Sequence, residues 1–164
     1  MIFDRLDVAL DGLSPSAAAL LSMLHFKPGL TTTGLARITG VSQPTAVRLI
    51  DGLERQGFVT RGKPDGRVTP LLLTTAGRAR AIHLQKRRLE ALDGLLAPLA
   101  PEERYQFERI LDQVLAGATT SRSFARTTCR LCKHDLCRPG LCPIGNRAVE
   151  LEQAEPENDL GDVQ

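Results

Sequence analysis

All four cysteines of this 164-residue chain lie within the short segment from residue 129 to residue 142. They are Cys129, Cys132, Cys137 and Cys142, with the spacing Cys-x2-Cys-x4-Cys-x4-Cys. Four thiolates form the ligand set of closed, tetrahedral Zn²⁺ sites, and a Cys-x2-Cys turn lets two sulfur atoms bind one ion. The spacing therefore predicts zinc as the first-choice cofactor, with these four cysteines as its ligands. A site closed in this way leaves no open position for hydrolytic catalysis.

Two other chemistries suit the same cysteines. Four thiolates also hold 2Fe–2S or 4Fe–4S clusters, and a proline follows Cys142, as it does at some cluster ligands. Thiol–disulfide exchange requires accessible thiolates, which the nearby cations Arg130, Lys133 and Arg138 would favour. The spacing is also similar to that of the zinc knuckle, with Cys137 where the knuckle has histidine. An iron–sulfur cluster and a redox switch therefore remain as alternatives to zinc.

Charge is segregated along the chain. Residues 1–128 carry a net charge of +5, residues 129–148 carry +3, and residues 149–164 carry −6. The basic body is compatible with a polyanionic partner such as double-stranded DNA, and the acidic run predicts a disordered tail. No apolar run approaches the roughly 18–20 residues of a membrane span, and the N-terminus does not resemble a signal peptide. The cytoplasm is therefore the expected location.

The sequence lacks the motifs of common active sites. It has three histidines and contains no His-Glu-x-x-His, no phosphate-binding glycine loop and no nucleophile elbow. We therefore expect that the chain is not an enzyme.

A helix-turn-helix is predicted from residue 31 onward. A short helix in "TTTGLARITG" is followed by a turn and by "VSQPTAVRLIDGLERQG", which begins at an N-cap serine, Ser42, and ends at Gly57. Apolar residues at helical spacing predict the buried face of the second helix: Ala46, Leu49, Ile50 and Leu53. The opposite face carries Thr45, Arg48, Gly52 and Arg55, and Gln43 stands at the exposed N-terminal end. The polar side chains in this set can bind base edges and phosphates.

A β-hairpin is expected directly after this helix. Phe58–Arg61 and Val68–Leu73 are β-prone and flank the turn sequence "KPDG", which is the arrangement of the wing in a winged helix. Pro70 in the second segment favours an exposed edge strand. The cations of the hairpin, Arg61, Lys63 and Arg67, are suited to phosphates or to a narrow minor groove.

The sequences "SQPTAVRLIDGLERQGFVTR" and "PDGRVTPLLLTTAG" resemble the core of the MarR family of winged-helix regulators. The family's wing carries Asp-x-Arg before Leu-Thr-x-x-Gly, which correspond here to Asp65 with Arg67 and to Leu73, Thr74 and Gly77. The resemblance spans roughly residues 14–118.

The resemblance implies a mainly α fold with a winged helix-turn-helix lobe. It also implies a homodimer that binds a pseudo-palindromic operator, usually as a repressor and often released by a small ligand. By this resemblance Gln43, Thr45 and Arg48 approach bases, while Asp65 braces Arg67 in the minor groove. The predicted DNA-binding residues are Ser42, Gln43, Thr45, Arg48, Arg61, Lys63 and Arg67, with Asp65 in support.

Helices outside the lobe independently predict a dimer. One helix after the wing shows Ala79, Ile82, Leu89, Leu92 and Leu96 at helical spacing, and a second shows Phe107, Ile110, Leu111, Val114 and Leu115. A small winged-helix unit cannot bury both stripes, whereas a two-fold axis would cover them. The predicted regions are 1–30 (N-terminal helices, one of them over Ile2–Leu13), 31–77 (winged helix-turn-helix), 78–126 (dimerisation helices), 127–148 (four-cysteine loop) and 149–164 (acidic tail).

The expected function is therefore sequence-specific regulation of transcription, modulated by a small ligand or by the metal or redox state of the cysteines. The alternative is a protein–protein interaction module with a structural zinc knuckle and no specific DNA binding.

Overall fold

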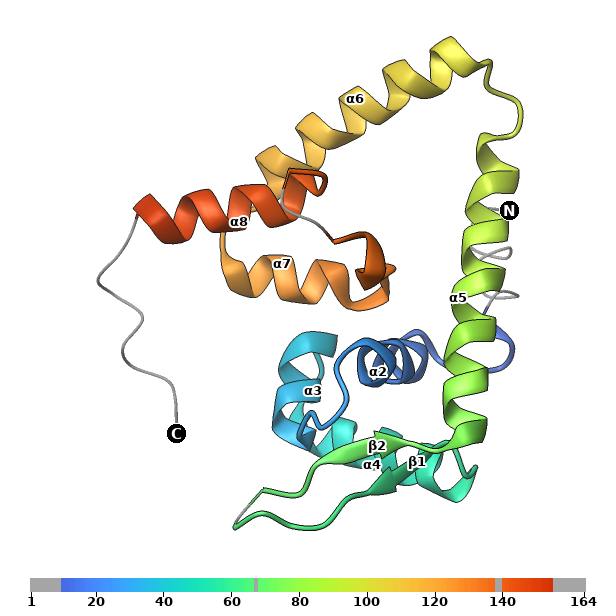
Figure 1. Ribbon diagram of the computed structural model, residues 1–164, viewed down its shortest axis with the longest axis vertical. Coiled ribbons are helices and arrows are strands. Elements are labelled where there is room, and N and C mark those ends of the chain that lie inside the picture. The colour runs from blue at the N-terminus through green and yellow to red at the C-terminus, as the bar shows by residue number, and fades with distance from the viewer. Residues whose placement is uncertain (1–9, 67, 138–139, 155–164) are drawn as a thin grey trace. The chain divides into compact units, whose positions relative to one another are not determined.

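The computed structural model describes residues 10–66, 68–137 and 140–154. It is mostly helical, with one two-stranded sheet, and the predicted mainly α winged-helix fold is confirmed (Figure 1). The chain folds as two units. The first comprises the described residues up to Pro98 together with Arg130–Cys132, and the second comprises Leu99–Cys129 and the described residues from Lys133 onward. None of the helices among the described residues is long and apolar enough to cross a membrane.

Helix α2 (Pro15–Phe26) is the centre of the first unit. Ser14 caps it through a hydrogen bond from the Ala17 N–H at 3.2 Å, and Pro15 occupies the first helical position, as predicted. Every residue from Ala17 to Leu24 is buried. A helix that is buried all round must be surrounded by other elements, and α2 packs with α3, α4, β2 and α5.

The helix-turn-helix consists of α3 (Thr32–Thr39) and α4 (Gln43–Arg55). Gly40 ends α3 in the left-handed conformation at φ 68°, which a residue without Cβ adopts without strain. Ala46, Ile50 and Leu53 of α4 are buried, and Leu49 is half-buried against the same core, so the predicted apolar face is confirmed. The core of the unit is completed by Leu35 of α3 together with residues of α2, the sheet and α5.

The predicted hairpin is confirmed as β1 (Val59–Arg61) paired antiparallel with β2 (Leu71–Leu73), with Val59 opposite Leu73. The second strand is shorter than predicted, because Thr69 and Pro70 lie outside the ladder. On the other edge of β2, Leu71 exchanges backbone hydrogen bonds with the chain at Gly29 and Leu30, at 3.1 and 3.0 Å. The hairpin is thus attached to the core at its base, while its tip extends away in Figure 1.

Helix α5 (Thr75–Leu96) begins against the hairpin. Thr74 caps it by accepting from the Gly77 N–H at 3.0 Å, and the same hydroxyl donates to the Gly57 carbonyl at 2.6 Å. Ala81 and Leu84 enter the core of the first unit.

The second unit contains α6 (Pro101–Ala118), α7 (Arg122–Thr128) and α8 (Pro143–Ala154), with α8 packed on the other two. Two short 3-10 turns, η1 (Cys129–Leu131) and η2 (His134–Leu136), lie between α7 and α8. The buried cluster of this unit is small: Ala125, Ile144 and Ala148, with Leu115, Cys129 and Cys142 packed against it. Arg122 and Glu152 join α7 to α8 through two hydrogen bonds of 2.6 Å.

Two sequence predictions were wrong in part. Residues 149–154, assigned to a disordered tail, form the end of α8, while residues 155–164 lie outside the described part of the chain. The helix predicted over Ile2–Leu13 does not reach Leu13, because Asp11 and Gly12 form a turn with φ of 52° and 81°. Most of that segment, residues 1–9, lies outside the described residues.

Candidate nucleic-acid interface

The first turns of α4 present polar side chains that the core does not use. Ser42, Gln43, Thr45 and Arg48 are all exposed, and they lie opposite the buried face of the helix. The Ser42 side chain accepts from the Thr45 N–H at 3.4 Å, and the hydroxyls of these two residues are 2.8 Å apart. The structure therefore brings four of the predicted DNA-binding residues together on one exposed helix end, which has the shape and chemistry to enter a major groove.

Arg61 is placed differently from the other predicted contacts. Its guanidinium lies 2.6 Å from Asp51 Oδ1 and 3.2 Å from Glu54 Oε2, both on α4. Arg61 therefore joins the base of the hairpin to α4, whereas the sequence predicted only a role toward DNA. Neither carboxylate was singled out from the sequence, because their contact with Arg61 depends on how the hairpin packs beside α4.

The tip of the hairpin holds the remaining predicted residues. Lys63 and Asp65 are exposed, and the backbones of Asp65 and Val68 exchange hydrogen bonds of 2.8 and 3.0 Å, which close the tip. Arg67 lies outside the described residues, so its bracing by Asp65 stays a prediction.

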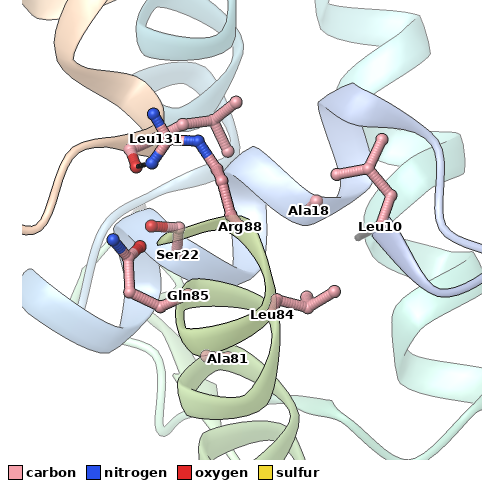
Figure 2. A pocket seen from close by; sticks show the side chains of 8 residues that line it. All are labelled: Leu10, Ala18, Ser22, Ala81, Leu84, Gln85, Arg88 and Leu131. Carbon is pink, nitrogen blue, oxygen red and sulfur yellow. Dashed lines mark hydrogen bonds between the residues drawn. The ribbon is translucent and has the colours of Figure 1, made fainter. Parts of the chain in front are cut away.

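A pocket lies between α2 and the middle of α5, within the first unit (Figure 2). Its polar lining includes Ser22 Oγ and Gln85 Nε2, which are buried and have no hydrogen-bond partner among the described residues. Burial lowers the pKa of the Arg88 guanidinium at the same site, and the charge of Cys132 offsets part of that shift. Unpaired buried polar atoms beside a desolvated cation suit a small polar or anionic ligand. This pocket could not be predicted from the sequence, because it depends on how two helices far apart in the chain pack together.

The four predicted metal ligands occupy distinct positions. Cys129 ends α7, Cys132 is half-buried in the first unit, Cys137 is exposed, and Cys142 precedes α8 and accepts from the Gly145 N–H at 3.3 Å. Within the described ranges, which include all four cysteines, no three His, Cys, Asp or Glu side chains are grouped closely enough to hold a metal ion. The zinc site therefore stays a prediction from spacing.

His134, in the turn η2, is half-buried. Its Nε2 lies 3.0 Å from the Cys129 carbonyl oxygen, to which it donates.

Comparisons with known proteins agree with this geometry. The MarR family model matches residues 11–67. An uncharacterized HTH-type transcriptional regulator of Bacillus subtilis, YdgJ, is 32% identical over 110 residues, which are 66% of this chain and 65% of that protein. The HTH-type transcriptional repressor YetL of the same organism is 32% identical over 104 residues, with 61% and 62% covered. The chain thus spans less than two thirds of the length of these curated relatives.

The fold of this chain is also similar to solved structures of MarR family proteins. The MarR family protein Rv2887 of Mycobacterium tuberculosis, in complex with salicylic acid, is 30% identical with a TM-score of 0.55, and the match covers 68% of this chain and 85% of that one. The same protein in complex with DNA gives 28% identity and a TM-score of 0.58, with 69% and 87% covered.

Proposed function

The chain belongs to the MarR family, and from that membership we propose that it is a homodimeric transcriptional repressor that binds a pseudo-palindromic operator. The family's named relatives are regulators of transcription, so the expectation that the chain is not an enzyme is confirmed. The observation that carries the proposal is the exposed end of α4. Gln43, Thr45 and Arg48 lie free of the core on a helix whose opposite face is buried.

Base recognition would come from this helix end. Arg48 can donate two hydrogen bonds to the guanine O6 and N7 acceptors, and Gln43 can pair with adenine in the same groove. Thr45 would approach a base in the same groove, as the family resemblance implies, and Ser42, the N-cap of α4, would bind a phosphate oxygen. Lys63 and Arg67 of the hairpin would contact the backbone and the minor groove, with Asp65 holding Arg67, as the family resemblance implies.

Apolar side chains left exposed on α6 support the dimer. Phe107, Ile110, Leu111 and Val114 are between 40% and 59% exposed, and no residue of α6 is buried. Ile82 of α5 is 52% exposed. A second copy would bury these side chains, and a two-fold axis would place two recognition helices on successive half-sites.

A small aromatic carboxylate is the effector class that we propose for the pocket between α2 and α5. Arg88 would pair with the carboxylate, and Ser22 and Gln85 would complete its hydrogen bonds, while Leu84 would contact the ring. The related protein Rv2887 has been solved with salicylic acid, which makes salicylate the natural first probe.

We propose zinc as the metal of the four cysteines, with an iron–sulfur cluster as the alternative. Two features of the second unit favour an ion there. Cys129 and Cys142 pack against the same buried cluster, and the N–H donated to the Cys142 sulfur is a contact that stabilises metal-bound thiolates. A bound ion would also stabilise a unit whose buried core is so small. Elemental analysis of anaerobically purified protein separates zinc from iron, and Cys132→Ser should lower the occupancy of either.

The proposed function is tested by selecting operators from random double-stranded DNA with the full chain. We expect enrichment of a palindromic site, and Arg48→Ala should weaken binding to it about tenfold or more, as for loss of one bidentate base contact. Lys86→Ala is the matched control, because Lys86 is a cation 73% exposed on α5 and paired only with Glu90 in the described structure. Failure to enrich any sequence would favour the alternative, an interaction module without specific DNA binding.

A further inference from the structure

A three-residue piece of the cysteine segment belongs to the first unit. Residues Arg130–Cys132 follow α7 in the chain, yet they pack with the winged-helix unit, and Leu131 lines the pocket between α2 and α5. Figure 2 shows the Arg88 side chain extending from α5 to the Leu131 backbone, where Nη1 donates to the carbonyl oxygen. One wall of this pocket is therefore formed by a residue of the cysteine segment, which is held there by a hydrogen bond to Arg88.

Leu131 provides a hydrogen-bond acceptor for only one of the polar side chains that line the pocket, Arg88. It supplies an isobutyl group to the apolar wall formed with Leu84, and one neutral carbonyl oxygen to Arg88. Ser22 Oγ and Gln85 Nε2 keep no partner among the described residues while Leu131 is in place. A carboxylate ligand would give Arg88 a charged acceptor, which makes a stronger hydrogen bond than a neutral carbonyl.

We propose that residues 130–132 are a displaceable internal plug of this pocket, and that a carboxylate ligand enters by replacing Leu131 on Arg88. The claim that residues 130–132 close the pocket depends only on the contacts of Leu131. The claim that they compete with a ligand depends also on the effector role proposed above. Displacement moves Cys132 together with Leu131, because the two residues are adjacent in sequence. Occupation of the pocket thereby changes the surroundings of one of the four thiols.

The plug is tested without any ligand by hydrogen–deuterium exchange of the full chain, read at the amides of residues 130–133. Leu131→Ala removes the inserted side chain, and Arg88→Gln removes the guanidinium donor. Each variant should raise exchange at these amides about tenfold, as expected for loss of one half-buried leucine contact or one charged hydrogen bond. Amides of α8 serve as the internal reference.

Two matched controls separate the plug from general loosening. Leu141→Ala truncates the same residue type in the same segment, but Leu141 is 70% exposed and does not line the pocket. Lys86→Gln removes an exposed cation from α5. Both should leave exchange at residues 130–133 unchanged. Wild-type exchange at the rate of an unstructured peptide, or equal rates in wild type and Leu131→Ala, would overturn the plug.

Salicylate then tests the competition by calorimetric titration. Leu131→Ala should bind it about tenfold more tightly than wild type, and salicylate should accelerate exchange at residues 130–133 of the wild-type chain. Equal affinity in the two proteins would overturn the competition. If neither protein binds salicylate while the exchange experiment gives the expected result, the proposed effector is wrong and the plug is retained.

Discussion

Replacing Gly77 with alanine should destabilise the first unit through one steric clash. A Cβ atom at Gly77 would lie 2.7 Å from the Phe58 carbonyl carbon and closer still to its oxygen. Ordinary van der Waals contact needs at least 3.4 Å. The clash is with backbone, so no side-chain rotation relieves it, and the first turn of α5 must move away from the hairpin.

The free-energy cost follows from what that movement breaks. Overpacking against a fixed group costs roughly 1–3 kcal/mol. Moving the turn also weakens the 3.0 Å bond from Thr74 N to Phe58 O and the 2.6 Å bond from the Thr74 hydroxyl to Gly57 O, each contributing roughly 0.5–1.5 kcal/mol. Alanine regains about 1 kcal/mol of helix propensity. The net effect of Gly77→Ala is a loss of about 1–5 kcal/mol in the free energy of unfolding.

Urea unfolding followed by circular dichroism measures this loss, with Gly52→Ala as the control. Gly52 is also helical, in α4, but a Cβ there meets nothing within 4 Å, so the control should gain up to about 1 kcal/mol. The two substitutions are chemically identical and should shift the urea midpoint in opposite directions. A Gly77→Ala protein as stable as wild type would refute the reasoning from the clash.

Three further predictions concern the core, the dimer and acid stability. Leu53→Ala should lower the unfolding free energy by about 2–5 kcal/mol in urea titrations, whereas Leu72→Ala, at a side chain 38% exposed, should cost far less. Ile110→Glu should convert a dimer into a folded monomer in sedimentation velocity, and a variant that stays dimeric would exclude this face of α6 from the interface. The hydrogen bond from Arg122 lowers the pKa of Glu152, so its stabilising effect is full above the ordinary carboxyl pKa and is lost as pH falls through the lowered value. The protection of the α8 amides, taken as their exchange relative to the intrinsic rate at each pH, should therefore fall below about pH 4 in wild type, and Glu152→Gln should show the lower protection already at neutral pH.

Local signals explain why the winged helix could be predicted from the sequence. The Ser42 cap and the apolar spacing of Ala46, Ile50 and Leu53 act within one helix, so α4 follows from its own residues. The hairpin follows in the same way from two β-prone segments around a turn.

The end of α8 was missed although a signal was present. Pro143 stands at the first helical position, and Ile144, Ala148 and Leu151 recur at helical spacing. The acidic residues interleaved after position 149 favour a disordered tail, and that indication conflicts with the helical periodicity.

Other features of the site depend on tertiary packing and have no local signal. Arg61 looks like any wing cation in the sequence, and its two carboxylate partners become apparent only when the hairpin lies beside α4. The pocket requires Ser22 and Arg88 to meet from helices far apart in the chain, and Leu131 arrives from more than forty residues beyond Arg88. The helical spacing of apolar residues likewise indicates that Ile82 and Ile110 belong to faces that pack against another surface. It does not indicate whether that surface belongs to the same chain or to a second copy.

The pairing of Arg61 has a consequence for the ionic-strength dependence of operator binding. Two carboxylates, Asp51 and Glu54, already neutralise this guanidinium, and together the three groups carry a net negative charge. Each cation that contacts a phosphate releases condensed counterions and steepens the fall of log affinity with log salt by about 0.9. Arg61 releases none while it stays paired. In the proposed mode of DNA binding, a count of wing cations therefore overstates the slope by about one unit per chain, and Lys63 and Arg67 are the hairpin cations that would contribute to it.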